Sequence, residues 1–127
     1  MLKLNIFILE DSQERIEYFK KQFNNHYLTI AEDINEPVYQ CLKTKKFDIV
    51  FLDHDLENHL LRQEKNGHTL AKYLVKYKLQ SHAIVYIHSM NPIGANNILK
   101  TLTNAGYEAQ WIPYYLLKQC GDKICEK

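Results

Sequence analysis

Short runs of apolar residues alternate along this chain with longer segments in which apolar residues recur every three or four positions. A short apolar run is typical of a buried strand, whereas a period of three to four residues is typical of an amphipathic helix. The runs predict strands over residues 3–9, 27–31, 47–52, 83–87 and 107–112. Amphipathic segments separate these runs, so strand and helix alternate along the chain.

Residues that favour helix ends mark where several predicted helices begin and stop. Ser12 is a suitable N-cap for the first helix, and Pro37 suits the first turn of the second. Asn91 and Pro92 supply a cap and a first-turn proline for the fourth helix, and Gly106 fits its C-terminal end. The third helix follows a long polar loop, and a last short helix is expected after the fifth strand.

This alternation predicts an α/β fold in which a parallel sheet carries helices on both faces. Five strands favour the order 2-1-3-4-5, in which the direction of winding reverses between the first and third strands. Ligands bind such sheets outside the carboxyl ends of the strands at that reversal. We therefore expect any functional site to involve the residues that follow the first, third and fourth strands.

The composition indicates one packed domain over residues 1–127, because 46% of the residues are hydrophobic and 24% are charged. The formal net charge is only +1. That balance argues against a protein that coats duplex nucleic acid, since this function needs a strongly basic face. A small phosphate ligand is compatible with it.

Cysteine usage and the N-terminal residues predict a cytoplasmic location. The chain has three cysteines, Cys41, Cys120 and Cys125, an odd number with no paired spacing, as is typical of reduced thiols. The apolar run LNIFIL meets Glu10 and Asp11 too soon to be a signal peptide or a membrane span. No membrane partner is expected.

Acidic residues follow two strands that should be neighbours in the sheet. Glu10 and Asp11 follow the first strand, and Asp53 and Asp55 follow the third. Two carboxylates about 4 Å apart repel by roughly 4 kcal/mol at an effective dielectric constant of about 20, so a proton, a lysine or a cation must neutralise them. Oxygen ligands at this density suit Mg²⁺ or Mn²⁺. We expect Glu10, Asp11 and Asp53 to hold the ion, with Asp55 as a further ligand; the alternative is a cluster of solvent-facing acids.

Two histidines stand close to these acids. His54 lies between Asp53 and Asp55, and His88 ends the fourth strand. Because histidine titrates near neutral pH, His88 and His54 are candidates for general acid or base, with Asp53 as a third catalytic group. The alternative for His88 is a structural hydrogen bond, and the alternatives for His54 are a metal ligand or a neighbour on the other face of the chain. The other histidines lack such a context and are expected at the surface: His26, His59, His68 and His82. His68 is a partial exception, because it follows Gly67 at the start of the third helix.

The segment after the fourth strand, HSMNPIGANN at residues 88–97, contains the residues expected to bind an anion. Ser89 and Asn91 precede a helix N-terminus, where free N–H groups and the helix dipole favour a phosphate. The alternative is an ordinary helix cap. Arg15, in the first turn after Glu10 and Asp11, is expected to reach a phosphate or to pair with an acid. Arg62, in the long polar loop, is either a mobile clamp or a residue without a role.

These positions resemble the receiver domains of two-component signalling, which have an acidic pair after the first strand, a phosphoacceptor aspartate ending the third and Ser or Thr ending the fourth. Glu10, Asp11, Asp53 and Ser89 match that pattern. The chain departs from it after the fifth strand, where Ile112 precedes the proline in place of the receiver lysine. The loop after Asp53 is also longer than in a typical receiver.

A divergent branch, the cyclic-phosphate-processing receiver-like domains, is more similar. Its members resemble LDHDL…G after the third strand and HSxNPxGxxN after the fourth, and this chain has LDHDL at 52–56, Gly67 and HSMNPIGANN at 88–97. Glu10 stands where aspartate is usual in that branch. The resemblance implies a three-layer receiver-like (flavodoxin-like) fold over nearly the whole chain.

We therefore expect a metal-dependent phosphoesterase that acts on a small cyclic phosphate, either a cyclic nucleotide or a 2′,3′-cyclic phosphate at an RNA end. Three alternatives stay open: a non-catalytic receiver or pseudo-receiver switched by phosphorylation of Asp53 or by a ligand, a haloacid-dehalogenase-like phosphatase, and a protein that sequesters a cyclic nucleotide. The second is the weakest, because such phosphatases carry their Asp pair on the first strand. Both a monomer and a homodimer are compatible with the sequence.

Overall fold

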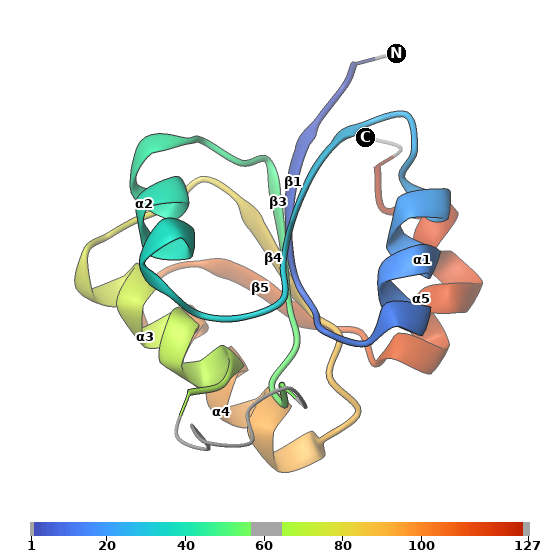
Figure 1. Ribbon diagram of the computed structural model, residues 1–127. Helices are drawn as coiled ribbons and strands as arrows, with labels where there is room; N and C mark the ends of the chain where they lie inside the picture. Colours follow the sequence, from blue (N-terminus) through green and yellow to red (C-terminus); the bar gives the residue numbers. More distant parts are fainter. Residues whose placement is uncertain (1, 57–64, 126–127) are drawn as a thin grey trace.

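In the computed structural model, described for residues 2–56 and 65–125, strands and helices alternate as predicted (Figure 1). The strands are β1 (Asn5–Leu9), β2 (Tyr27–Ala31), β3 (Ile49–Leu52), β4 (Ile84–Ile87) and β5 (Glu108–Trp111). The helices are α1 (Gln13–Gln22), α2 (Glu36–Thr44), α3 (Gly67–Lys76), α4 (Pro92–Asn104) and α5 (Tyr114–Cys120), followed by the short 3₁₀ helix η1 (Gly121–Lys123). Within these described ranges, no helix has the length and apolar character needed to cross a membrane.

The five strands form one parallel sheet in the order β2-β1-β3-β4-β5, which confirms the predicted order. In the register of this sheet, Leu9 pairs with Leu52, and Leu52 pairs with Ile87. β1, β3 and β4 therefore end at the same level. The residues that follow these three strands emerge side by side at one edge of the sheet.

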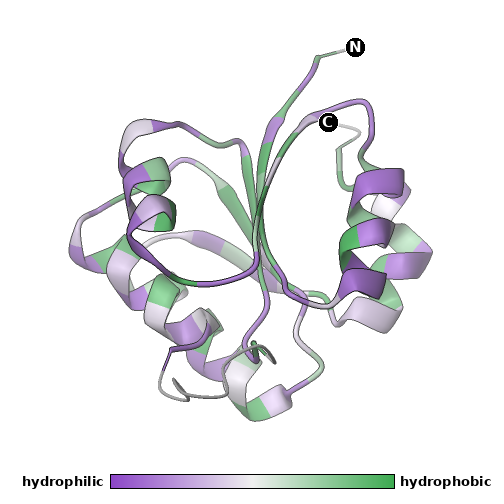
Figure 2. Cartoon of the chain, in the orientation of Figure 1, coloured by the Kyte–Doolittle hydropathy of each residue, from purple (hydrophilic) through white to green (hydrophobic). Residues whose placement is uncertain are grey.

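Helices cover both faces of the sheet, with α1 and α5 on one face and α2, α3 and α4 on the other (Figure 1). Along β1, Phe7 and Leu9 point into the core under α2, α3 and α4, while Ile6 and Ile8 point into the core under α1 and α5. All four side chains are fully buried, and Figure 2 shows the central strands as largely hydrophobic. This is the expected three-layer, receiver-like (flavodoxin-like) fold.

Four of the strands begin one or two residues later than predicted, and the reason is visible at two of them. The Leu4 N–H donates to Nδ1 of His26 at 3.0 Å, and the Phe47 N–H donates to Oε1 of Gln80 at 3.0 Å. The N–H groups of Leu4 and Phe47 thus donate to side chains from outside the sheet and not to a neighbouring strand, so β1 and β3 begin later. Hydrophobic patterning cannot reveal this, because Leu4 and Phe47 are as apolar as the strands that follow them.

Candidate functional site

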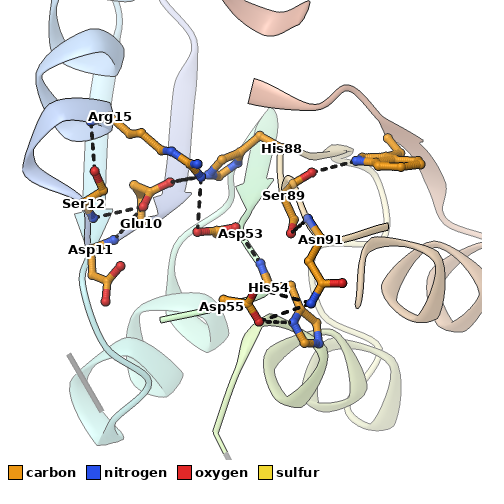
Figure 3. A network of polar contacts seen from close by, with 11 residues as sticks. Glu10, Asp11, Ser12, Arg15, Asp53, His54, Asp55, His88, Ser89 and Asn91 are labelled. Carbon is orange, nitrogen blue, oxygen red and sulfur yellow. Dashed lines mark hydrogen bonds and ion pairs between the residues drawn. The ribbon is translucent and has the colours of Figure 1, made fainter. Parts of the chain in front are cut away.

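A buried acidic group with a histidine forms where β1, β3 and β4 end (Figure 3). Glu10, Asp53 and His88 each offer one potential metal-ligand atom, and these atoms lie within 4.8 Å of one another. Glu10 is 1% exposed, Asp53 5% and His88 0%. The strand order therefore brings together residues that lie far apart in the sequence.

Glu10 is fixed by the turn between β1 and α1 and by His88. Its Oε2 accepts the backbone N–H groups of Asp11 at 3.1 Å and Ser12 at 3.0 Å. Its Oε1 lies 2.7 Å from Nε2 of His88 and 3.7 Å from the Arg15 guanidinium. Burial raises the pKa of Glu10, but the hydrogen bond and charge of His88, the Ser12 N–H and Arg15 outweigh burial, so the net pKa is lowered. The Glu10 carboxylate is thus held in its charged form.

Asp53 is less well compensated. Its Oδ1 accepts the His54 N–H at 2.8 Å, and its Oδ2 lies 3.7 Å from the Arg15 guanidinium. Burial, the largest cause, raises the pKa of Asp53 to about 6; His88, the His54 N–H and Arg15 oppose the rise, whereas the Glu10 charge adds to it. Arg15 alone therefore does not neutralise the two carboxylates. A bound divalent cation would relieve the remaining repulsion.

The donor set suits a hard divalent cation bound through the Glu10 and Asp53 carboxylates, and it suits His88 less well as a ligand. A histidine that binds a metal almost always donates its second ring N–H to a partner. Nδ1 of His88 is buried with no hydrogen-bond partner in the described part of the chain, and the ring packs against Phe19 and Phe51. We infer that His88 keeps a proton on Nε2 and donates it to Glu10.

The other two predicted metal ligands, Asp11 and Asp55, lie outside this three-residue group. Asp11 is buried beside Glu10. The Asp55 side chain is 61% exposed, and its carboxylate lies 2.7 Å from Nδ1 of His54 and 3.3 Å from Nδ2 of Asn91. His54 is therefore paired with Asp55, away from the Glu10–His88 contact (Figure 3).

A cleft of about 210 Å³ opens beside Asp53. It is lined by Arg15, Asp53, Asp55, Ser89, Met90 and Asn91. Within it, the Ser89 Oγ accepts the Asn91 N–H at 3.0 Å, and no acceptor in residues 2–56 or 65–125 takes the hydroxyl proton, which can therefore face an anion. The cleft is smaller than the roughly 300–1,000 Å³ of a typical ligand pocket, and its size suits a phosphate group with a cation. All three predicted phosphate contacts in the described chain (Arg15, Ser89, Asn91) line it.

Two glycines of the sequence motifs, Gly67 and Gly94, allow the chain to pack closely around His54. A side chain on Gly67 would collide with the backbone carbonyl of Asp53, and one on Gly94 would collide with the His54 ring. Asn91 completes this arrangement, because its Oδ1 accepts the Gly94 N–H at 3.1 Å and so caps α4. The two motifs, LDHDL…G and HSMNPIGANN, are therefore packed together. Gly67 of the first and Gly94 of the second both lie against residues 53–54 of the LDHDL segment.

Sequence reasoning passed over Met90 and Trp111, both of which border this site. Met90 lines the cleft, and the Trp111 indole N–H donates to the Ser89 carbonyl at 2.8 Å. In the sequence, the only feature that could have indicated Met90 is that it is an apolar residue between two polar ones. The Trp111 contact depends on the register of β5 against β4, which pairs Trp111 with Ile87.

The remaining histidines need one correction. His26 and His68 are half-buried rather than on the surface: His26 accepts the Leu4 N–H, and Nε2 of His68 lies 2.7 Å from the Thr101 hydroxyl. His82 is exposed, as expected. Two other predicted positions, His59 and Arg62, lie outside the described residues.

A larger hollow, of about 270 Å³, lies at the opposite edge of the sheet, between the turns that lead into β3 and β4. The residues that line it include Lys43, Lys45, Lys46 and Lys78, and no carboxylate is among them. It therefore lacks the ligands for a hard divalent cation. Two carboxylates of the candidate site, those of Asp53 and Asp55, line the smaller cleft and not this hollow.

The sequence model of the family described as "Cyclic-phosphate processing Receiver domain" matches residues 6–104. The chain belongs to this family. No curated protein sequence matches it. The match includes both motifs and all three residues of the buried acidic group.

Solved structures place this receiver domain among response-regulator receivers by fold. The receiver domain of sensor histidine kinase PA1611 from Pseudomonas aeruginosa PAO1, with a magnesium ion coordinated in its active site cleft, superposes with a TM-score of 0.71 at 10% identity, covering 97% of this chain and 94% of that one. A CheY-like receiver domain protein from Methanospirillum hungatei JF-1 gives 0.65 at 19% identity, covering 96% and 94%. A Burkholderia pseudomallei response regulator with a phosphorylated aspartic acid gives 0.63 at 14% identity, covering 86% of this chain but 59% of that one.

Proposed function

We propose that this receiver domain is a divalent-metal-dependent phosphoesterase that opens a small cyclic phosphate, either a cyclic nucleotide or the 2′,3′-cyclic phosphate of an RNA end. The observation that carries the proposal is the position of Asp53: a buried, under-neutralised carboxylate beside a phosphate-sized cleft. Glu10 and Asp53 would hold Mg²⁺ or Mn²⁺, in line with the magnesium ion in the Pseudomonas receiver structure. Bound there, the ion would polarise the phosphoryl group and lower the pKa of a water molecule.

The reaction adds water to phosphorus and breaks one ring P–O bond, which leaves a phosphomonoester and a free hydroxyl group. Arg15, the Ser89 hydroxyl and the Asn91 amide would bind the non-bridging oxygens from the walls of the cleft. Asp55 would accept the proton of the attacking water, because it is the exposed carboxylate of the cleft. The leaving oxygen would take its proton from the solvent that fills the open cleft.

In this proposal both histidines act through carboxylates, which differs from the direct proton transfer suggested by the sequence. His88 is fully buried, so contact between its ring and a substrate would require Glu10 to move aside. Its role is to hold Glu10 in position. His54, whose Nδ1 lies 2.7 Å from the Asp55 carboxylate, would orient Asp55 and stabilise the proton that it receives.

The second candidate function is a receiver that is phosphorylated on Asp53 without further turnover. The Burkholderia structure, which has a phosphorylated aspartic acid on a similar fold, favours it. The apolar Ile112 in place of the receiver lysine weighs against it. Incubation with acetyl phosphate and Mg²⁺ separates the two: a stable aspartyl phosphate with no turnover of cyclic phosphates would support the receiver.

Phosphorus NMR of the protein with Mg²⁺ or Mn²⁺ tests the proposed function. The substrates are 2′,3′- and 3′,5′-cyclic nucleotides and ADP-ribose cyclic phosphates. We expect at least one to give a phosphomonoester, and Asp53→Asn to lower kcat/KM by about 10³-fold or more, equivalent to about 4 kcal/mol of transition-state stabilisation. Glu108→Gln, an exposed acid at the start of β5, is the matched control and should leave the rate unchanged. Turnover that survives Asp53→Asn would place the chemistry elsewhere, and tight binding without hydrolysis would indicate sequestration.

A further inference from the structure

Large apolar side chains are exposed beside the phosphate-sized cleft. Met90, which lines the cleft, is 47% exposed; Trp111 at the end of β5 is 36% exposed, and Ile93 in the first turn of α4 is 77% exposed. Exposed apolar side chains that gather next to a polar cleft are typical of a binding surface. The proposed hydrolysis of the phosphate does not use them.

Trp111 is held in one orientation by the same segment that forms the cleft. Its indole N–H donates to the Ser89 carbonyl at 2.8 Å, and the Ser89 side chain lines the cleft. The next residue continues the sheet, because the Ile112 N–H donates to the Ile87 carbonyl at 2.8 Å. A ring fixed at both its backbone and its indole nitrogen loses little conformational entropy when a ligand binds to it.

The size of the cleft implies that most of a nucleotide would lie outside it. A volume of about 210 Å³ suits the phosphate and a cation, so the sugar and any base would extend onto the rim. The flat Trp111 ring, hydrogen-bonded to the Ser89 carbonyl, and the flexible thioether of Met90, the residue after Ser89, suit the face of a nucleobase, since every base can stack on an aromatic side chain. A sugar phosphate without a base would leave this apolar surface uncovered.

We propose that Trp111 and Met90 form a seat for a nucleobase, so that the substrate is a nucleotide cyclic phosphate rather than a cyclic phosphate without a base. This inference rests on the proposed function for the position of the phosphate. Trp111 and Met90 act as specificity-determining residues that touch the base. The nucleotide can be free or can be the last residue of an RNA strand, because both present the same base and phosphate.

Fluorescence titration tests the seat without requiring turnover, because the chain contains a single tryptophan. The ligands are 3′-AMP and methyl riboside 3-phosphate, which differ only in the base and are products of the two candidate substrates. We expect 3′-AMP to quench Trp111 and to bind at least about tenfold more tightly than the base-free compound. Equal affinity of the two compounds, with no quenching, would overturn the inference.

Variants then assign the preference to the two residues. Trp111→Ala and Met90→Ala should each lower the preference of kcat/KM for adenosine 2′,3′-cyclic phosphate over methyl riboside 2,3-cyclic phosphate, the first by about tenfold. Trp111→Phe, which preserves stacking and guards against a folding defect, should retain most of it. Tyr115→Ala is the control, since Tyr115 is an exposed aromatic residue on α5. A preference that is unchanged in both alanine variants would overturn the seat.

These outcomes separate the seat from the proposed reaction. If 3′-AMP quenches Trp111 but no cyclic phosphate is hydrolysed, the reaction fails and the seat stands. If both cyclic phosphates are hydrolysed equally well, the reaction stands and the seat fails. A pentanucleotide ending in a 2′,3′-cyclic phosphate distinguishes the two sources: tighter binding than the mononucleotide indicates an RNA end, and equal binding indicates a free nucleotide.

Discussion

Asp53→Asn is expected to stabilise the metal-free protein at neutral pH while it lowers kcat/KM for hydrolysis by about 10³-fold or more. Burial raises the pKa of Asp53 from an ordinary value of 3.8 to about 6. The folded protein therefore binds this proton more tightly than the unfolded chain does. The stability that results is fully present below about pH 4 and is lost as the pH rises through 6. The full loss corresponds to about 3 kcal/mol, and asparagine avoids it because it carries no charge.

The expected net gain is smaller than that loss, because the asparagine amide that keeps its oxygen on the His54 N–H turns an NH₂ donor toward the Arg15 guanidinium, which is itself a donor. We expect Asp53→Asn to raise the free energy of unfolding by about 1–2 kcal/mol at pH 7.5 in EDTA, or a melting temperature higher by about 3–6 °C. At pH 4.5 the gain should largely disappear. Thermal unfolding at the two pH values measures this, with Glu108→Gln as the control. A variant less stable than wild type at pH 7.5 would show that Asp53 is well compensated without a metal.

His88→Leu is expected to destabilise the protein strongly, because it leaves the Glu10 carboxylate buried without its closest partner. The contact between Nε2 of His88 and Oε1 of Glu10 is 2.7 Å, and both side chains are at most 1% exposed. Removing one partner of such a pair costs about 3–5 kcal/mol. Since His88 positions Glu10, the same variant should also weaken metal binding.

A double-mutant cycle with Glu10→Gln isolates the contact between the two side chains. We expect a coupling free energy of about 2–3 kcal/mol from urea unfolding. His26→Leu is the control, because His26 is half-buried and accepts one neutral hydrogen bond, from the Leu4 N–H, with an expected cost of about 1 kcal/mol. If His88→Leu costs no more than His26→Leu, His88 fills space and does not hold Glu10.

The fold could be predicted from the sequence because β1, β3 and β4 are distinct apolar runs and amphipathic segments separate the strands. The central strands are apolar on both faces, which a parallel sheet between two helical layers requires. Given the strand order, Glu10, Asp53 and His88 must lie close together. Each is the first residue after its strand, and the three strands end in register at Leu9, Leu52 and Ile87. These parts of the site depend only on the order and ends of the strands.

The orientation of side chains beyond the strand ends could not be predicted in this way. His54 turns toward Asp55, because Gly67 and Gly94 bring the chain close around it, and both glycines are distant in sequence. Periodicity contains no information about such contacts. Trp111 reaches Ser89 through the pairing of β5 with β4, and a shift of one residue in this register would place its side chain on the other face of the sheet.

The central claim is that Glu10 and Asp53 form a binding site for a divalent cation. Isothermal titration calorimetry with Mn²⁺ and Mg²⁺ at pH 7.5 tests it most directly. The account predicts saturable binding of one ion per chain to the wild type and to Glu108→Gln, and loss of binding in Glu10→Gln and Asp53→Asn. Binding to Asp53→Asn that equals binding to the wild type, or no binding to the wild type at millimolar concentrations, would contradict it.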